Sequence, residues 1–307
     1  MKPRIASAPC SFGVFETNIE DGVHPTPAQL VKLMHEGGYA GTELGPPGFL
    51  GSGEAVAALL AQAGLELAGS FLMFRFSREP GFDEDLNAME SALAQLRIAA
   101  GDNEPPVVLL SDAFGAEPDR MSFAGAIDQH PEAWLSADRQ RLLLANVHRA
   151  AERCSEMGFR CSLHHHAGTY IETRREIAAV VEAMDTDLLG LCFDTGHVAF
   201  GGSEPLDVLR DYVGLVNHVH LKDVDRGLLR AVHADGGGLD AAWDTGVFCG
   251  LGDGDAQVET CVDELGRNGY AGWLVVEQDR PLSPDWTLAD AARAQRANRK
   301  WLAARGL

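Results

Sequence analysis

Short apolar runs alternate along the chain with longer segments of helical periodicity. The apolar runs lie at residues 5–8, 39–45, 65–74, 107–110, 159–163, 188–194, 215–222 and 273–277. Runs of this length, mostly bounded by Gly or Pro, are typical of strands that are buried on both faces. The segments that follow them predict helices at residues 27–36, 54–62, 84–100, 139–157, 173–184, 205–212, 256–267 and 289–304.

This alternation of strand and helix predicts the fold class. The helix at residues 173–184 even carries a capping box, because Glu176 stands three residues after Thr173. Strict alternation predicts a parallel sheet. Eight such units in 307 residues, without a break in composition, predict a single domain (residues 1–307) that folds as one α/β domain, a (β/α)₈ barrel. The rival is an open doubly wound sheet, but residues 9–13 lack its usual Gly-rich fingerprint.

Residues 111–137 form a long irregular stretch between two predicted elements. The stretch contains Gly, Pro and aromatic residues. A loop of this length in a compact domain is usually a lid or a disordered insert. Because it follows the fourth strand, we expect it to lie at the C-terminal ends of the strands and to cover the site there.

Charge and composition exclude several classes of partner. The formal net charge is −20, with 45 acidic against 25 basic residues, and such a surface repels nucleic-acid backbones. No apolar run approaches the roughly 20 residues that a membrane span needs, and no signal peptide is recognisable. We therefore expect a cytoplasmic protein with no nucleic-acid or membrane partner. The six Cys are scattered without a Cys-x-x-Cys pair, which favours reduced thiols over disulfides or a structural zinc site.

Three consecutive histidines, His164 to His166, stand where the fifth predicted strand ends. Because side chains alternate along a strand, His164 and His166 point to one face and His165 to the other. Two imidazoles on one face suit a divalent metal, or proton transfer beside one. A surface histidine cluster is the alternative interpretation.

The last three predicted strands also end in residue types that bind metals, at Asp194, His220 and Glu277. In a barrel these strand ends and His164 would converge near the axis, and mixed imidazole and carboxylate donors suit a divalent ion with a position left for substrate. Alternation places His218 and His220 on one face, so spacing does not choose between them. Each residue also has a structural alternative, such as a helix cap for Asp194 or an ion pair for Glu277.

Six motifs carry a resemblance to a known family. They are residues 41–45 (GTELG), 164–169 (HHHAGT), 193–197 (FDTGH), 218–223 (HVHLKD), 252–255 (GDGD) and 272–277 (GWLVVE). With them the chain resembles, over essentially its whole length, the xylose isomerase-like family of TIM-barrel sugar isomerases, epimerases and dehydratases. The triple histidine followed by Gly-Thr resembles the dehydratase branch.

The resemblance implies one metal ion and its ligands. Family ligands correspond to Asp194, His220 and Glu277, and the ion would be Mn²⁺ or Co²⁺ first, with Zn²⁺, Mg²⁺ or Fe²⁺ as alternatives. Most relatives have a fourth ligand, a Glu, where this chain has His164, with His166 two residues later. The imidazole could keep the ligand role, or His166 could complete or flank the shell. The exchange also removes a carboxylate that acts as a base in related epimerases.

The resemblance further implies a metal-dependent hydro-lyase acting on a small keto-polyol. The enzyme would remove the proton α to the ketone and expel the β-hydroxyl as water. The candidate acids and bases, in order of preference, are His166, His197, Glu43, Lys222 and Glu172. Glu43 and Lys222 could equally form salt bridges or orient substrate hydroxyls. Candidate substrate contacts are Arg226, Trp134 and Phe12.

Two other functions use the same features. One is a metal-dependent isomerase or epimerase of a keto-sugar, and the other is a barrel that binds a sugar without catalysis. An apurinic endonuclease of related fold is disfavoured by the net charge of −20 and by too few further ligands for a multi-metal site. Since family members are often dimers or tetramers, the resemblance leaves a homodimer or a homotetramer open.

Overall fold

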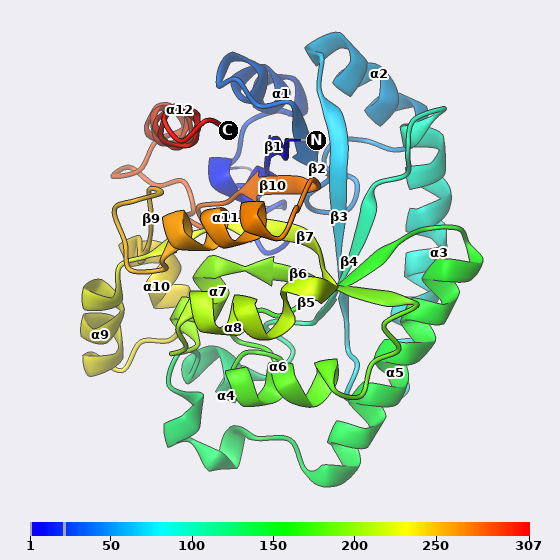
Figure 1. Cartoon of the computed structure of the whole chain (residues 1–307), viewed down its shortest axis with the longest axis vertical. Helices are drawn as coiled ribbons and strands as arrows, with labels where there is room; N and C mark the ends of the chain where they lie inside the picture. Colours follow the sequence, from blue (N-terminus) through cyan, green and yellow to red (C-terminus); the bar gives the residue numbers. More distant parts are fainter. Residues whose placement is uncertain (1, 21–22) are drawn as a thin grey trace.

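The strands of residues 2–20 and 23–307, the part described by the computed structural model, form a closed parallel barrel (Figure 1). The barrel strands are β1 (Arg4–Ser7), β2 (Gly41–Glu43), β3 (Glu66–Phe74), β4 (Val107–Asp112), β5 (Cys161–His164), β6 (Leu189–Asp194), β7 (Val216–Leu221) and β10 (Trp273–Val276). Their order around the barrel is β1-β10-β7-β6-β5-β4-β3-β2. Pairing of β1 with β10, Ile5 opposite Leu274, closes the ring. The predicted (β/α)₈ barrel is confirmed, and the open sheet is excluded.

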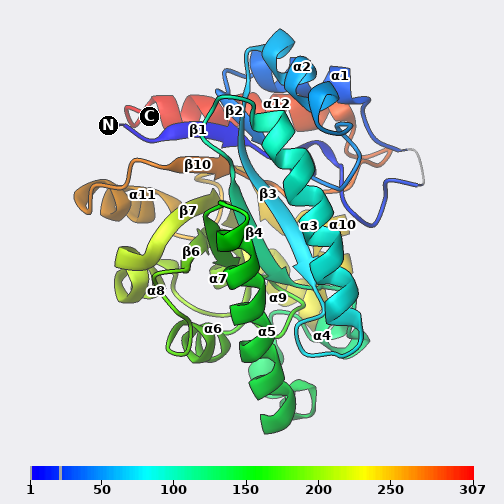
Figure 2. The same ribbon diagram turned by 90° about the vertical axis from the view of Figure 1, so that its right-hand side faces the viewer.

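Long helices cover the outside of the barrel, as Figure 2 shows for the two beside β3 and β4. They are α1 (Pro27–Glu36), α2 (Glu54–Ala63), α3 (Gly81–Ala100), α5 (Ala137–Glu156), α6 (Arg174–Val181), α8 (Pro205–Tyr212), α11 (Val258–Arg267) and α12 (Leu288–Ala303). Each overlaps a helix that the sequence predicts. The predicted capping box at Thr173 is present, with Glu176 as its partner. In the described part of the chain, no helix combines the length and the apolar character that crossing a membrane requires.

Shorter elements that hydrophobic periodicity does not reveal occupy the loops. They are η1 (Pro9–Phe12), α4 (Pro118–Ser122), η2 (Ile127–Gln129), η3 (Pro131–Ala133), α7 (Thr195–Phe200), η4 (Val213–Leu215), α9 (Arg226–Ala234) and α10 (Leu239–Thr245). A small antiparallel sheet pairs β8 (Asp223–Val224) with β9 (Phe248–Cys249). Nearly all of these elements follow the C-terminal end of a barrel strand, so they surround the mouth of the barrel on that side.

The main hydrophobic core lies between the strands and the outer helices. Leu191 on β6 and Val219 on β7 pack into this core. Cys192, the residue after Leu191, points the other way and belongs to a small cluster with Val107 and Leu109 inside the barrel. The alternation of side chains therefore places the polar residues of β6 and β7 inside the barrel. The upper interior of the barrel is consequently polar, and the candidate site lies there.

The segment between β4 and α5 is more regular than the sequence predicts, because it contains α4, η2 and η3. It is fastened to α6 by the buried Arg120, whose guanidinium contacts both Glu176 oxygens at 2.8 and 3.0 Å. Glu172 binds it as well, accepting from the Gly125 N–H at 2.7 Å. Phe114, near its start, lines the cavity at the mouth of the barrel. That the segment acts as a lid stays a prediction.

Candidate active site

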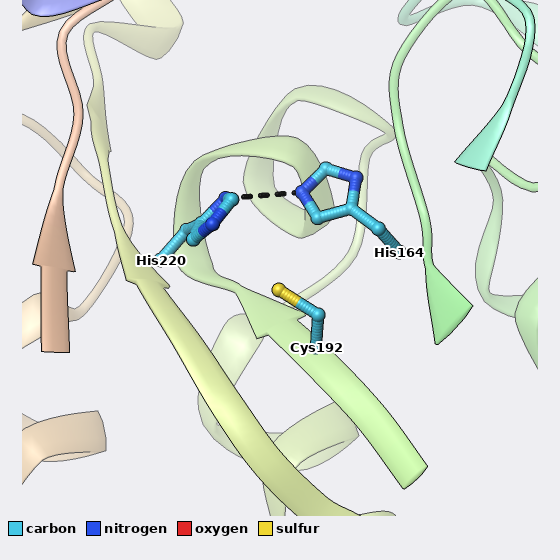
Figure 3. A group of neighbouring side chains, drawn as sticks. All are labelled: His164, Cys192 and His220. Carbon is cyan, nitrogen blue, oxygen red and sulfur yellow. Dashed lines mark hydrogen bonds between the residues drawn. The ribbon is translucent and has the colours of Figure 1, made fainter. Parts of the chain in front are cut away.

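Four donor side chains meet at the C-terminal ends of β5, β6, β7 and β10. His220 Nδ1 lies 3.1 Å from His164 Nε2, 3.5 Å from Asp194 Oδ2 and 3.2 Å from Glu277 Oε2. All four residues are buried. Figure 3 shows His164 and His220 facing each other, with the Cys192 thiol turned toward the same space. The structure therefore brings together the four residues that the sequence marks as candidate ligands.

The cluster favours a positive charge at its centre. Asp194 Oδ1 accepts the His197 N–H at 2.9 Å and caps α7, but the buried Oδ2 has no hydrogen-bond partner. Although burial opposes ionisation, Lys222 and His197 hold the pKa of Asp194 well below its ordinary value. For Glu277, burial likewise favours the neutral form, but His220 and Lys222 outweigh it and lower the pKa. Two ionised carboxylates beside the imidazole of His164, whose pKa burial lowers, match the donor chemistry of a divalent ion.

Glu43 orients His220 from the opposite side. Its Oε1 accepts from His220 Nε2 and from His218 Nε2, each at 2.8 Å. Donation from Nε2 to Glu43 turns Nδ1 of His220 toward Asp194 and Glu277. Although burial opposes the charge, Cys192 and Glu277 raise the pKa of His220 well above its ordinary value, so a bound ion would replace the proton on Nδ1. Carboxylates in this position commonly fix the tautomer of a metal-binding histidine. Sequence spacing did not decide whether His218 or His220 is the candidate ligand. In the structure His220 reaches the cluster, whereas His218 is bound to Glu43.

A second donor group shares His220. It consists of His164, Cys192 and His220, which place two nitrogens and a sulfur within 4.8 Å of one another, as do the donor atoms of Asp194, His220 and Glu277. The thiol is protonated, because burial raises the pKa of Cys192 to about 12. The donor set of Asp194, His220 and Glu277 is therefore better prepared to bind a hard or borderline ion. The set that contains Cys192 would first have to lose the thiol proton.

His166 has the features of a base. Its Nδ1 lies 2.7 Å from the Ala167 carbonyl oxygen, so this nitrogen carries the proton and Nε2 keeps its lone pair. Burial, together with the charges of His164 and Lys222, holds the pKa of His166 well below its ordinary value, so the ring is neutral. The Phe114 ring stacks on it at 4.8 Å between centroids. The result is a neutral imidazole held in one orientation at the edge of the cavity.

Lys222 is a fixed cation rather than a base. Its Nζ lies 2.8 Å from Asp279 Oδ2, 2.9 Å from Glu277 Oε2 and 2.9 Å from His197 Nε2. Three acceptors occupy its three N–H groups. Although burial opposes the charge, Asp194, Asp279 and Glu277 raise the pKa of Lys222 well above its ordinary value. His197 stands behind this amine and does not line the cavity.

The cavity holds about 500 Å³ of open space. Of the candidate acids and bases, His166, Glu43 and Lys222 line it, as do the donors His164, His220 and Glu277. The sequence analysis missed several lining residues, namely Cys10, Glu16, Phe71, Trp243 and Asp279. Asp279 had a usable signal, because it stands two residues beyond Glu277, whereas the others lie in loops or on apolar positions without one.

Four of the candidates from sequence lie elsewhere. Glu172 accepts the N–H groups of residues 125 and 168, each at 2.7 Å, and holds two loops together. Arg226 pairs with Glu204 at the rim. Trp134, 37% exposed, packs beneath the Arg175 guanidinium in a separate groove. Phe12 is fully buried in the main core. None of the four lines the cavity, because each already has a structural partner.

Comparisons with known proteins agree with this geometry. Residues 31–305 match the family described as xylose isomerase-like TIM barrel. The inosose dehydratase of Geobacillus kaustophilus is 32% identical over 274 residues, covering 89% of this chain and 87% of that protein. The rhizopine catabolism protein MocC of Rhizobium meliloti is 31% identical over 82% of this chain and 74% of its own length.

Among solved structures, the probable 3-DHS dehydratase AsbF of Bacillus anthracis has a TM-score of 0.68. The alignment covers 99% of both chains at 15% sequence identity. At this identity the likeness supports the barrel fold and nothing finer.

Proposed function

The chain belongs to the xylose isomerase-like TIM barrel family, and from this premise we propose that it is a metal-dependent dehydratase of a keto-polyol. The observation that carries the proposal is the neutral His166 at the edge of a cavity that is also lined by His164, His220 and Glu277 of the donor cluster, with Asp194 directly behind them. Its similarity to an inosose dehydratase supports the same reaction class. Inosose, a cyclic polyol with one ketone, is therefore the substrate to test first.

The four donors would hold one divalent ion, and Mn²⁺ or Co²⁺ are the first candidates for a mixed imidazole and carboxylate set. The unpartnered Asp194 Oδ2 supports this assignment. When bound, the ion would supply Lewis-acid polarisation of the substrate ketone. Glu43 would keep His220 in the ligand tautomer, because it accepts the Nε2 proton at 2.8 Å.

His166 would take the proton from the carbon next to the ketone. Its Nδ1 is engaged by the Ala167 carbonyl oxygen, so Nε2 is the nitrogen available for this transfer. The Phe71 and Phe114 rings pack around the imidazole at 6.2 and 4.8 Å. Such packing would hold the ring in place and exclude water from the new carbon–carbon double bond.

Lys222 would position groups rather than exchange protons. Its ammonium holds the carboxylates of Glu277 and Asp279 on one side of the cavity. With its charge compensated in this way, it would stabilise the ionised form of Glu277 without being consumed by the reaction. Glu172 would act on structure alone, through its contacts to the loops at residues 125 and 168.

The test is to incubate the metal-loaded protein with inosose in D₂O and to follow the substrate and its products by NMR. A dehydratase forms an unsaturated or dione product with loss of water. An isomerase or epimerase, the alternative function, instead gives deuterium at the α carbon or a new stereoisomer without water loss. Binding of inosose without either change would indicate a sugar-binding barrel.

A further inference from the structure

A carboxyl group lies on the wall of the cavity opposite His166. In the eight-strand ring, β1 and β5 stand four positions apart, so the loops that follow them lie on opposite sides of the mouth. Glu16 belongs to the loop after β1, and His166 follows β5. Both line the same cavity. A proton donor and a proton acceptor placed here would face the same substrate without neutralising each other.

Glu16 differs from the other carboxyl groups that line this cavity. Glu43 is bound to His218 and His220, and both Glu277 and Asp279 are bound to Lys222. By contrast, no side chain among residues 2–20 and 23–307 forms an ion pair with Glu16. Its carboxyl group is therefore free to contact a substrate.

The surroundings of Glu16 extend its protonated form to near neutral pH. Burial, followed by the nearby carboxylates, raises its pKa from 4.5 to about 7, although its own backbone N–H opposes the shift. The titratable groups that line the two cavities with it are Cys10, Glu43, Asp85, His164, His166, His220, Lys222, Glu277 and Asp279. The carboxylates in this set disfavour a further negative charge, and Lys222 is already engaged by three acceptors.

We propose that Glu16 is the catalytic acid that protonates the departing β-hydroxyl of the substrate. The proposal rests on the dehydration proposed above. His166 takes the α proton, and the electron pair of that C–H bond becomes the new carbon–carbon double bond. The C–O bond breaks with its electron pair on oxygen, the Glu16 proton joins this oxygen, and water leaves. His166 then releases the α proton to solvent, and the Glu16 carboxylate takes up a proton from solvent through a second cavity of about 620 Å³, which it also lines, so both groups return to their starting states.

The neighbouring groups are less suited to this step. The Lys222 ammonium donates to three acceptors, and Asp279 is held by one of those contacts at 2.8 Å. Burial and the charges of Glu277 and Asp279 raise the pKa of the Cys10 thiol well above its ordinary value, which makes it a weak acid. Glu16 alone among these four combines an unpaired carboxyl group with a place on the wall opposite the base.

The experiment compares two leaving groups in Glu16→Gln. The substrates are inosose and its analogue with fluorine in place of the β-hydroxyl, because fluoride departs with little need for protonation. For inosose, kcat should fall by about 10²-fold, in the range for loss of a general acid. For the fluoro analogue, we expect kcat within about threefold of the wild type. Glu20→Gln, an exposed carboxyl group four residues on, is the matched control and should leave both rates unchanged.

Bound metal and thermal stability of the variant should match the wild type, which separates catalysis from folding. Equal loss on both substrates would assign Glu16 to substrate binding and overturn the proposal, as would unchanged rates on both. A wild-type protein that releases neither water nor fluoride overturns the proposed dehydration itself, and the role of Glu16 with it. Release of fluoride but not of water by the wild type would likewise contradict the dehydration, whereas equal loss or unchanged rates in Glu16→Gln, with an active wild type, overturn the acid alone.

Discussion

Two walls of the cavity are built in different ways. The first, here called the donor wall, consists of buried polar residues at strand ends, namely His164, His220 and Glu277, which line the cavity, and Asp194 behind them. The second, the loop wall, consists of residues from β3 and from the loops after β1 and β4, namely Cys10, Glu16, Phe71 and Phe114. Side chains of the donor wall contact one another, whereas Phe71 and Phe114 of the loop wall present stacked aromatic rings.

The difference separates two tasks. Donor-wall residues stand on strands that hydrogen-bond to their neighbours, so their positions are rigid enough to define a metal geometry. Loop-wall residues stand mostly on connections, which can change shape and chemistry without disturbing the barrel. We therefore expect substitutions in the donor wall to abolish metal binding and activity. Substitutions in the loop wall should change the rate or the choice of substrate while the metal stays bound.

The largest effect should follow from Asp194→Asn. The amide keeps the Oδ1 acceptor for the His197 N–H, which lies at 2.9 Å, so the cap of α7 survives. Loss of the charge should lower dehydration by more than about 10³-fold, since an ionised ligand is removed from the site. Metal analysis and circular dichroism would show a folded, metal-poor protein. The exposed Asp187→Asn is the matched control, and a fully active Asp194→Asn would remove this residue from the metal site.

The second prediction concerns the reaction type. His164→Glu places a carboxylate 3–4 Å from His220 and Asp194, where the wild type has an imidazole at 3.1 and 3.7 Å. The added negative charge should retain the metal but weaken polarisation of the substrate ketone. We expect dehydration to fall by about 10²-fold, with exchange of the α proton preserved or increased. Unchanged dehydration at equal metal content would show that His164 does not set the reaction type.

A smaller effect should follow from Glu43→Gln, which acts on the donor wall from behind. Its Oε1 accepts from both His218 and His220 at 2.8 Å. Loss of such a partner of a metal-binding histidine typically costs about 10–100-fold in metal affinity. Titration with Mn²⁺ should show this weakening, and excess metal should restore most of the rate. An affinity equal to the wild type would contradict the orienting role.

The smallest effect on catalysis should come from Glu172→Gln, outside both walls. Burial raises the pKa of Glu172 to about 7, against the opposing pull of Arg120 and two backbone N–H donors. The folded protein then binds a proton that the unfolded chain releases near pH 4.5, so this stabilisation is complete at low pH and is lost as pH rises through 7. The free energy of unfolding should fall by about 1–3 kcal/mol between pH 5 and 8.

Chemical denaturation at several pH values would measure this slope. In Glu172→Gln the slope should be shallower, and activity should stay within about threefold of the wild type because the residue does not line the cavity. Asp112, whose pKa burial also raises to about 7, contributes a slope of the same sign and remains in the variant. A slope identical to that of the wild type would mean that Glu172 is ionised throughout.

The same two walls mark how far the sequence could be interpreted. Strand alternation and barrel geometry were enough to bring His164, Asp194 and Glu277 to one place, because a strand end has a fixed direction. The choice of His220 over His218 came from the family resemblance, because the two histidines share one face. Their role as metal ligands stays a prediction. Loop positions carry no such periodicity, so Glu16 and Cys10 were not found. The six-residue helix α7 was missed because it is shorter than the windows in which helical periodicity is visible.

The candidate substrate contacts that the structure places outside the cavity share one physical cause. Arg226 was chosen through the family resemblance and Trp134 as an aromatic residue, but nothing in the sequence shows that Glu204 and Arg175 are their partners. Similarly, Glu172 has the chemistry of a catalytic carboxylate and yet is used to join two loops. Such long-range partners arise only when the barrel is closed.

The central claim is that one ion, held by the donor wall, is required for dehydration of a keto-polyol. The most direct test removes metal from the purified protein with a chelator, adds Mn²⁺ in substoichiometric steps, and measures bound metal and dehydration of inosose in the same samples. We predict no dehydration without metal and a rate that rises in proportion to bound Mn²⁺ up to one ion per chain. Full dehydration by the metal-free protein, or metal binding without any dehydration, would contradict the claim.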